Sequence, residues 1–365
     1  MALLVSGKDQ RRKNNNFSKN LILWQKDFGR HNLPWQKKIT PYRIWISEIM
    51  LQQTQVKTVI PFFERFIKKY PTVKELSKSK IEEVFELWTG LGYYRRAENI
   101  YKSSQIIKSK YDLIFPSTYE EIVELPGIGR TTAGAILSLA FNKRYPILDG
   151  NVKRVLERYF AIQSEKNVDK ELWKLSENLL PKSKNNIYSQ AIMDLGATIC
   201  TKKIPLCERC PVNLSCKSFK FDLTNVIPMK RKKIIKKEKN LSYLLVVKNN
   251  NLILMQKNSN KGIWANLWSL LNFNNKNDCE KFIKKINLAS SVYHYASMQH
   301  NLTHMKLNIN IYRIDVKHFP ITNEFYWKNI YGKIATSKPF VEIIKKLTEE
   351  LENENSTLFK VKKRT

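Results

Sequence analysis

The alternation of hydrophobic and polar residues changes character near residue 225. Up to about Lys220, apolar residues recur at intervals of three and four, the spacing of helices that bury one face. One such set comprises Val152, Val155, Leu156 and Tyr159. Few runs in this half alternate with a period of two. The pattern therefore predicts a mainly helical domain over residues 1–225.

Strand-like runs distinguish the second half. Stretches rich in branched and aromatic residues predict strands at residues 241–247, 252–256 and 307–316. Helical patterns predict helices at residues 278–286 and 339–351. These elements predict a smaller α+β domain over residues 241–350. The basic stretch 226–240 is expected to link the two domains, and residues 351–365 form a polar tail.

The net charge of the chain indicates the kind of partner it binds. Among 365 residues, 64 are Lys or Arg and 32 are Asp or Glu, a formal net charge of +32. Such an excess favours a polyanionic partner, most simply nucleic acid, although Lys, Asn and Ile are abundant along the whole chain. No apolar run is long enough for a membrane-spanning helix. The first residues lack the order of a secretory signal, so we expect a cytoplasmic, nucleoid-associated protein without membrane partners.

Four of the five cysteines lie in one stretch of 17 residues, 200–216. Their spacing is C-x6-C-x2-C-x5-C, at Cys200, Cys207, Cys210 and Cys216. A zinc site usually pairs its ligands as two close knuckles, whereas only Cys207 and Cys210 are close here. A [4Fe–4S] cluster is held by four thiolates and tolerates wider gaps. We expect this cofactor, with zinc as the alternative metal.

A glycine-containing turn precedes one amphipathic helix. Residues 125–133 read LPGIGRTTA, in which Gly127 and Gly129 allow a tight hairpin and a helix begins at about Arg130. Backbone N–H groups at the start of that helix point toward an anion. The pattern predicts a helix-hairpin-helix, which includes Thr131 and binds DNA phosphates whatever the base sequence.

Two carboxylates are candidates for acid–base chemistry. Glu48 follows Trp45 by one helical turn in an apolar segment, so its pKa is expected to be raised, as a general acid requires. Asp149 precedes a predicted helix, whose first N–H groups should favour its charged form. Such a pair suits cleavage of a glycosidic bond. The alternatives are a surface glutamate and a turn aspartate beside an Asn151 cap.

Polar and aromatic residues near helix ends could fill the space left by a flipped base. The candidates are Leu51, Gln53 and Tyr93. Packing is the alternative role for the Tyr93–Tyr94 pair.

The motifs together cover nearly all of the first 220 residues. They read LPW at 33–35, PYRIWISEIMLQQTQV at 41–56, GLGYYRRAENI at 90–100, LPGIGRTTAGAILSLAF at 125–141 and LDGNVKRVL at 148–156. With the four cysteines, they resemble the MutY family of adenine-specific DNA glycosylases of base excision repair. The resemblance implies a helix-hairpin-helix glycosylase domain with a [4Fe–4S] loop, followed by a Nudix-like domain.

The resemblance also implies an activity. A monomer would bind duplex DNA at A:8-oxoguanine or A:G mispairs and excise the adenine. Glu48 resembles the general acid that protonates the flipped base, and Asp149 resembles the carboxylate that supports the oxocarbenium-like sugar. Leu51, Gln53, Tyr93 and the hairpin would contact DNA.

One residue separates this activity from its main alternative, an endonuclease III-like glycosylase/lyase for damaged pyrimidines. Those enzymes carry a lysine in the hairpin that forms a Schiff base, and the matching residue here is Thr131. A hydroxyl cannot form that imine, so we predict a monofunctional enzyme. A decayed, non-enzymatic DNA-binding protein is a further alternative, but both carboxylates are present.

The second domain resembles Nudix hydrolases without their metal site. After the GIWANLW segment at 262–268, expected to be a strand, the next acidic residues are Asp278 and Glu280. Magnesium therefore lacks the clustered carboxylates it needs, which disfavours nucleotide hydrolysis. The family's 8-oxoguanine sensor, Phe-Ser-His, corresponds here to Leu302, Thr303 and His304. Leu302 can fill space but cannot stack. The alternative for His304 is a buried strand residue.

Overall fold

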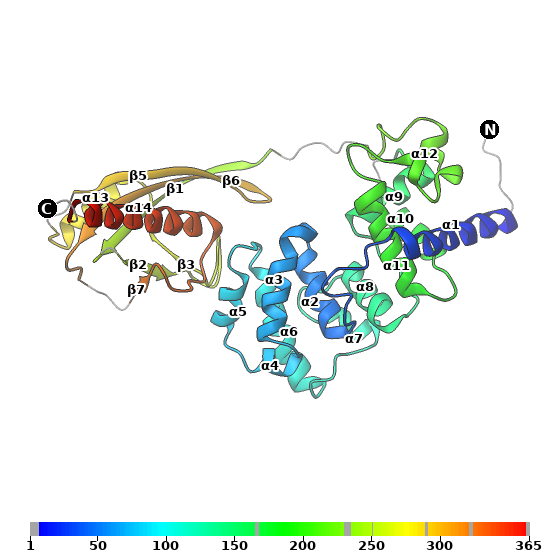
Figure 1. The fold of residues 1–365 in the computed structure, drawn as a ribbon, viewed down its shortest axis with the longest axis horizontal. Helices are drawn as coiled ribbons and strands as arrows, with labels where there is room; N and C mark the ends of the chain where they lie inside the picture. Colours follow the sequence, from blue (N-terminus) through cyan, green and yellow to red (C-terminus); the bar gives the residue numbers. More distant parts are fainter. Residues whose placement is uncertain are drawn as a thin grey trace. The chain divides into compact units, whose positions relative to one another are not determined.

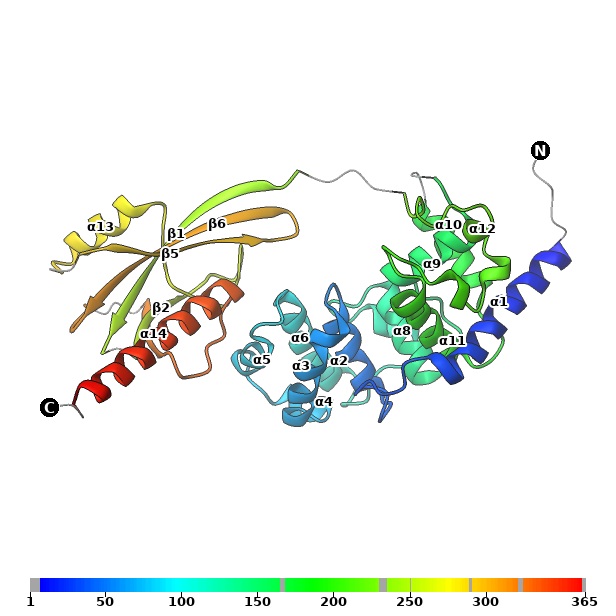
Figure 2. The ribbon, with the colours of Figure 1, turned by 45° about the horizontal axis from the view of Figure 1, so that its top comes forward.

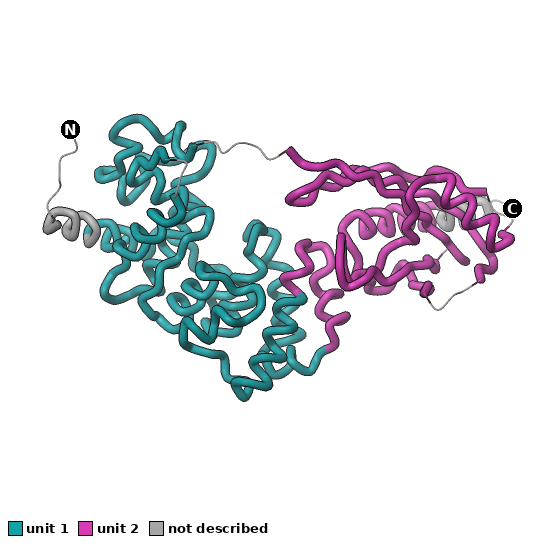
Figure 3. The backbone as a smooth tube through the Cα atoms, turned by 180° about the vertical axis from the view of Figure 1, so that it is seen from behind, with its two compact units in different colours: residues 1–79, 98–232 teal, residues 80–97, 233–365 magenta. Residues whose placement is uncertain are grey.

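The computed structural model describes residues 7–164, 168–229, 235–249, 251–288, 291–320 and 324–362, with side chains from residue 16 to residue 353. It divides into two compact units, shown in Figure 3. Unit 1 comprises residues 1–79 and 98–232, and unit 2 comprises residues 80–97 and 233–365. In the described parts of the chain, no helix has the length and apolar character needed to cross a bilayer.

Unit 1 is helical, as the three- and four-residue spacing predicts (Figure 1). Its α-helices are α1 (Gly7–Phe28), α2 (Pro41–Leu51), α3 (Val56–Lys69), α4 (Val73–Ser77), α6 (Arg95–Lys110, which starts in unit 2), α7 (Tyr119–Val123), α8 (Arg130–Phe141), α9 (Gly150–Phe160), α10 (Val168–Asn178), α11 (Asn185–Asp194) and α12 (Lys217–Lys220). Shorter turns are the π-helix η1 (Leu195–Ile199) and the 3-10 helices η2 (Cys207–Arg209) and η3 (Asn213–Ser215). Large side chains such as Trp45, Phe63 and Tyr188 are fully buried between these helices.

Local chemistry fixes where the important helices begin. Thr40 caps α2 by accepting from the N–H of Arg43, and Pro41 occupies the first helical position. Thr118 and Glu121 form a capping box at the start of α7. Helix α8 begins at Arg130, as predicted.

Unit 2 contains helix α5 (Ile81–Trp88) and an α+β domain. Within its described residues, seven strands form one sheet with the central order β3-β2-β1-β6-β5, while β4 pairs with β1 and β7 with β2. The strands are β1 (Lys237–Lys248), β2 (Leu252–Lys257), β3 (Trp268–Ser269), β4 (Leu271–Phe273), β5 (Tyr293–Asn301), β6 (Met305–Val316) and β7 (Phe325–Asn329). Strands β1 and β6 pair in parallel along their whole length, and the other pairs are antiparallel.

A helix covers each face of this sheet (Figure 2). Alternate residues of β1 point to opposite faces, as a strand requires. Tyr243 and Leu245 join the core under α14 (Lys338–Lys362), and Leu244 and Val246 join the core under α13 (Lys276–Lys285).

Several sequence expectations for unit 2 are wrong in their boundaries. Strand β1 begins at Lys237, inside the expected linker, because it pairs with β6 from its first residue. Helix α14 continues to Lys362, through most of the expected polar tail. The GIWANLW segment is mainly a turn, with Gly262, Trp264 and Asn266 at positive φ, and β3 begins only at Trp268. Strands β5 and β7 were not predicted from the sequence.

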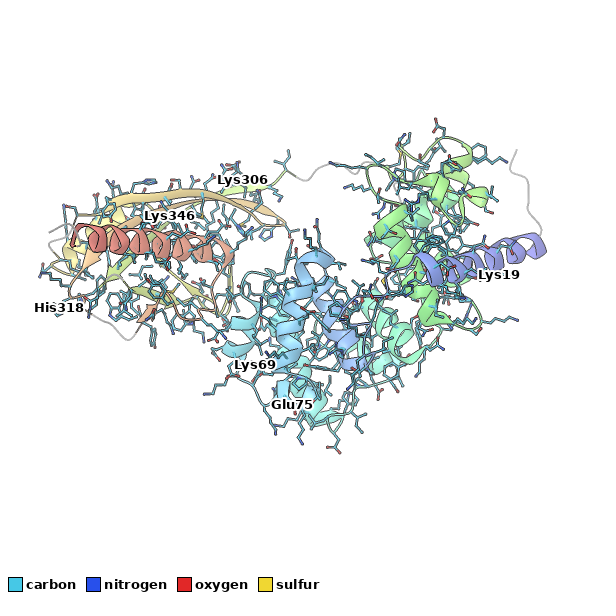
Figure 4. All side chains as sticks on the ribbon, in the orientation of Figure 1. Lys19, Lys69, Glu75, Lys306, His318 and Lys346 are labelled. Atoms are coloured by element: carbon cyan, nitrogen blue, oxygen red, sulfur yellow. The ribbon has the colours of Figure 1, made fainter. Side chains whose placement is uncertain are left out.

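Positive side chains are spread over both units (Figure 4). Lys19 on α1, Lys69 on α3 and Lys346 on α14 are all exposed. This distribution agrees with the general abundance of lysine in the chain, so charge alone does not locate a binding surface.

Candidate active site and cysteine loop

Glu48 lies in the middle of α2 among buried apolar residues. Its neighbours along the helix, Trp45, Ile49 and Met50, are almost fully buried, whereas Glu48 keeps partial access to solvent. Loss of hydration raises its pKa from 4.5 to about 7, and the negative charge of Asp149 contributes to the same shift. The predicted rise is confirmed, so about half of these carboxyls hold a proton near neutral pH.

Asp149 is the N-cap of α9. Its Oδ1 accepts a 2.7 Å hydrogen bond from the N–H of Val152, and the Asn151 amide lies 3.4 Å from Oδ2. Burial nevertheless raises the pKa of Asp149, and these hydrogen bonds only partly offset the loss of hydration. The helix-start N–H groups favour the charged form of Asp149, as expected, but burial outweighs them and the net pKa is raised. Asp149 itself is the N-cap, so the alternative of a turn aspartate beside an Asn151 cap is wrong.

Side-chain hydrogen bonds connect the hairpin to the two segments that carry the carboxylates. The amide Nε2 of Gln52, at the end of α2, lies 3.3 Å from the Gly127 carbonyl and 3.3 Å from the Thr132 hydroxyl. The Thr131 hydroxyl donates to the carbonyl of Leu148, the residue before Asp149, at 3.3 Å. The hairpin thus ties the Glu48 helix to the Asp149 cap. No sequence signal separates Gln52 from its neighbour Gln53.

Close backbone packing also positions Asp149. Gly134 lies on the inner face of α8, and a Cβ at this position would stand only 2.3 Å from the carbonyl oxygen of Pro146. Glycine therefore lets α8 press directly against the segment that leads to Asp149. In the hairpin, Gly127 has a φ of +82°, which explains the glycine there.

Two of the predicted base-opening residues have left-handed backbones. Gln53 has a φ of 56° in unit 1, and Tyr93 has a φ of 52° in unit 2. Non-glycine residues seldom adopt this conformation, and it is common at functional sites. Gln53 is exposed, Tyr93 is half-exposed and Leu51 is half-buried. Each is therefore accessible to a ligand.

The four clustered cysteines of unit 1 line one pocket, together with Arg158, Ile199 and Phe219. Arg158 is buried, and its Nη1 lies 3.5 Å from the Cys200 sulfur and 2.6 Å from the Thr201 carbonyl. A single zinc ion would need its ligands about 2.3 Å from one point. Among the described residues, no group of three or more His, Cys, Asp or Glu is placed to hold a metal ion. Sulfurs around a common pocket are the donors that an iron–sulfur cluster uses.

The predicted sensor residues form the turn between β5 and β6. The N–H of Leu302 donates to the Met305 carbonyl, and Lys236 donates to the Leu302 carbonyl at 2.6 Å. Leu302 packs against the core under α14, whereas Thr303 and His304 are exposed. His304 is therefore not a buried strand residue, which was the alternative.

Comparisons with known proteins agree with this arrangement. The model of the HhH-GPD superfamily of base excision DNA repair proteins matches residues 46–178, and a NUDIX domain model matches residues 242–346. An adenine DNA glycosylase of Buchnera aphidicola subsp. Baizongia pistaciae is 43% identical, covering 91% of this chain and 96% of that protein. The Homo sapiens adenine DNA glycosylase is 39% identical over a region that covers 55% of this chain and 39% of the human protein.

Solved structures show the fold of the helical part. A thermostable thymine-DNA glycosylase is 28% identical with a TM-score of 0.53, covering 58% of this chain and 99% of its own. A non-covalent endonuclease III–DNA complex, at 24% identity and a TM-score of 0.51, covers 58% of this chain and 98% of its own. These likenesses show the fold of 58% of this chain.

Proposed function

Because this chain belongs to the family of adenine DNA glycosylases, we propose that Glu48 and Asp149 carry out the excision of adenine. The enzyme is a monofunctional DNA N-glycosylase of base excision repair, and its partner is DNA. The observation that supports the two residues most directly is the pKa of Glu48, which burial and Asp149 bring to about 7. A carboxyl that is half-protonated near neutral pH is suited to general acid catalysis.

The reaction follows from these two side chains. Protonated Glu48 donates its proton to a ring nitrogen of the flipped adenine, which becomes a better leaving group. The C1′–N9 bond breaks and its electron pair leaves with the base, so positive charge develops on the sugar. Asp149 lies close enough to raise the pKa of Glu48, and its carboxylate opposes that positive charge. Water adds to C1′ and loses a proton to a carboxylate, which gives free adenine and an abasic site.

Because Thr131 has no amine, we expect the reaction to stop at the abasic site. Strand cleavage by a lyase needs an amine that attacks C1′ and forms an imine. Thr131 supplies a hydroxyl, which hydrogen-bonds to the Leu148 carbonyl. In our proposal its role is to hold the hairpin against the Asp149 segment.

The cysteine loop would hold a [4Fe–4S] cluster through its four thiolates. Such a group supplies one-electron redox chemistry when bound and cross-links residues 200–216. The loop also carries basic side chains suited to DNA phosphate contacts, namely Lys202, Lys203, Arg209, Lys217 and Lys220.

The turn at Leu302–His304 would read 8-oxoguanine opposite the adenine. The exposure of Thr303 and His304 at the tip of a hairpin supports this role. We further propose that the enzyme acts as a monomer on A:8-oxoguanine and A:G mispairs of nucleoid DNA in the cytoplasm.

A single-turnover assay tests the reaction type. The protein is incubated with short duplexes that carry A opposite 8-oxoguanine or opposite G, and each time point is divided between hot alkali and no treatment. We expect strand breaks only after alkali, and faster base release opposite 8-oxoguanine. Breaks without alkali would show lyase chemistry and contradict the role of Thr131. Equal rates on both duplexes would contradict lesion reading.

Iron analysis tests the cofactor. We expect Cys210→Ala to lower the iron content and visible absorbance of the purified protein to near background, because one of four thiolate ligands is lost. Cys279→Ala is the matched control, since Cys279 is buried in the α13 core, far along the chain from the loop. A wild-type protein that holds zinc and no iron would contradict the proposal.

A further inference from the structure

The loop that carries Tyr93 belongs to the same compact unit as the C-terminal sheet. Residues 80–97 lie between helices of unit 1 in the sequence, yet they cluster with residues 233–365 (Figure 3). The segment contains α5 and the turn 89–94, so the C-terminal domain contacts the loop that carries Tyr93, a residue proposed to separate the DNA strands.

The hydroxyls of Thr89 and Tyr94 lie within hydrogen-bond distance of backbone carbonyls of the C-terminal domain. The phenol of Tyr94 donates to the backbone carbonyl of Thr336 at 2.5 Å and lies 3.4 Å from the N–H of Gly90. The Thr89 hydroxyl lies 3.0 Å from the Phe85 carbonyl and 3.4 Å from the Ile334 carbonyl. A hollow beside these contacts is lined by Glu86, Thr89, Lys333, Ile334, Val341 and Ile344.

The acceptor side is rigidly held by the sheet. Thr336 is almost fully buried, its hydroxyl donates to the Trp268 carbonyl at 2.6 Å, and it forms a parallel bridge with Trp268. The N–H of Trp268 in turn donates to the Ala335 carbonyl at 2.9 Å. Strand β3, which contains Trp268, pairs with β2 of the main sheet. The carbonyl that Tyr94 contacts therefore has a fixed position.

The loop that carries Tyr93 is also held by hydrogen bonds within its own segment. The Gly92 carbonyl accepts from the Trp88 indole at 3.0 Å and from Arg96 Nη2 at 3.0 Å. The Arg96 guanidinium is buried and lies 5.3 Å from the centre of the Tyr93 ring. Burial also raises the pKa of Tyr94, which keeps its phenol a neutral donor. Tyr93 thus sits in a loop with few alternative positions.

We propose that Tyr94 is a positioning residue that fixes the Tyr93 loop onto the C-terminal domain through the Thr336 carbonyl. This inference rests on the proposed role of Tyr93 in opening the DNA. Through this bond the C-terminal domain contributes to base excision even apart from reading the lesion. The exposed Glu82–Lys257 ion pair joins α5 to β2 at 2.8 Å and does not involve the turn 89–94. Exposed ion pairs contribute little.

The test is a double-mutant cycle on the full-length enzyme. Tyr94→Phe removes the phenol oxygen and keeps the ring, which packs on Phe85. Loss of one hydrogen bond should lower the population of the correctly positioned loop by about three- to tenfold. We expect Tyr94→Phe to lower the single-turnover rate on A:8-oxoguanine duplex by roughly that factor, and by less than about twofold when Tyr93 is already alanine. Fluorescence of 2-aminopurine beside the mispair should fall in parallel, because it reports base unstacking.

Controls separate this inference from the proposed function. Glu82→Gln should leave both the rate and the fluorescence unchanged. If Tyr93→Ala is slow but Tyr94→Phe is as fast as wild type, only the inference is overturned. If Tyr93→Ala itself is fast, the role of Tyr93 fails and the inference fails with it. Equal effects of Tyr94→Phe in both backgrounds would show general destabilisation and also overturn the inference.

Discussion

The Glu48→Gln enzyme should release adenine about 10²–10⁴-fold more slowly than wild type while still binding DNA. Glutamine has nearly the shape of the protonated acid and keeps α2 intact, but it cannot give a proton to the base. The measurement is the single-turnover rate on A:8-oxoguanine duplex, together with the dissociation constant for the same duplex. Near-normal turnover would contradict the assignment of Glu48.

The wild-type rate should also depend on pH in a defined direction. Because protonated Glu48 is the active form and its pKa is about 7, the rate should fall as the pH rises through 7. The residual activity of Glu48→Gln should lack this alkaline decline. Glu64→Gln, an exposed substitution on α3, is the matched control and should keep the wild-type profile.

Stability should change with pH in the same range. The pKa of Glu48 is higher in the folded protein than its usual 4.5, so the folded state binds the proton more tightly than the unfolded state. Its contribution is therefore complete below about pH 4.5 and is lost as the pH rises through 7. Each tenfold difference in proton affinity is worth about 1.4 kcal/mol, so ionising Glu48 costs roughly 3 kcal/mol at high pH. Glu48→Gln should be more stable than wild type at pH 8.5, as urea unfolding would show.

The spacing of apolar residues predicted the helical character of the first half because helices such as α3 and α9 bury one apolar face. Residues 241–247 of β1 and 253–255 of β2 were equally visible as buried apolar runs, and β6 was visible through alternate apolar residues that are buried under α14. Strand β5 was missed because most of its residues keep some exposure and its sequence, YHYASMQHN, is polar. Short strands such as β3 exist only through pairing with β2, which no local pattern reports.

The direction of the pKa shift was predictable from the sequence for one of the two candidate carboxyls and not for the other. Trp45 and the apolar run around Glu48 were enough to predict a raised pKa, because those neighbours lie on the same helix. The pKa of Asp149 is raised because burial outweighs the hydrogen bonds from the helix-start N–H groups, and that burial is not visible in the local sequence pattern. The grouping of residues 80–97 with the C-terminal domain also depends on contacts across more than 200 residues.

The Asp149→Asn enzyme should lose about 10²–10³-fold in the rate of adenine release. Asparagine is as good an N-cap as aspartate, so α9 should still begin at Gly150. The new side-chain oxygen should accept the same hydrogen bond from the N–H of Val152. The carboxylate that opposes the positive sugar is gone, however. The rate is measured in single turnover beside Asp169→Asn, which alters an exposed aspartate paired with Lys153 and should leave the rate unchanged.

The pH profile then distinguishes a catalytic Asp149 from a purely structural one. The negative charge of Asp149 helps to raise the pKa of Glu48, so its removal should lower that pKa. The alkaline decline of the remaining activity should therefore begin at a lower pH than in wild type. If Asp149 only caps α9, asparagine replaces it without loss, and the melting temperature and the rate stay those of wild type. If Asp149→Asn keeps the wild-type profile and rate, Asp149 only caps α9 and another group must support the sugar.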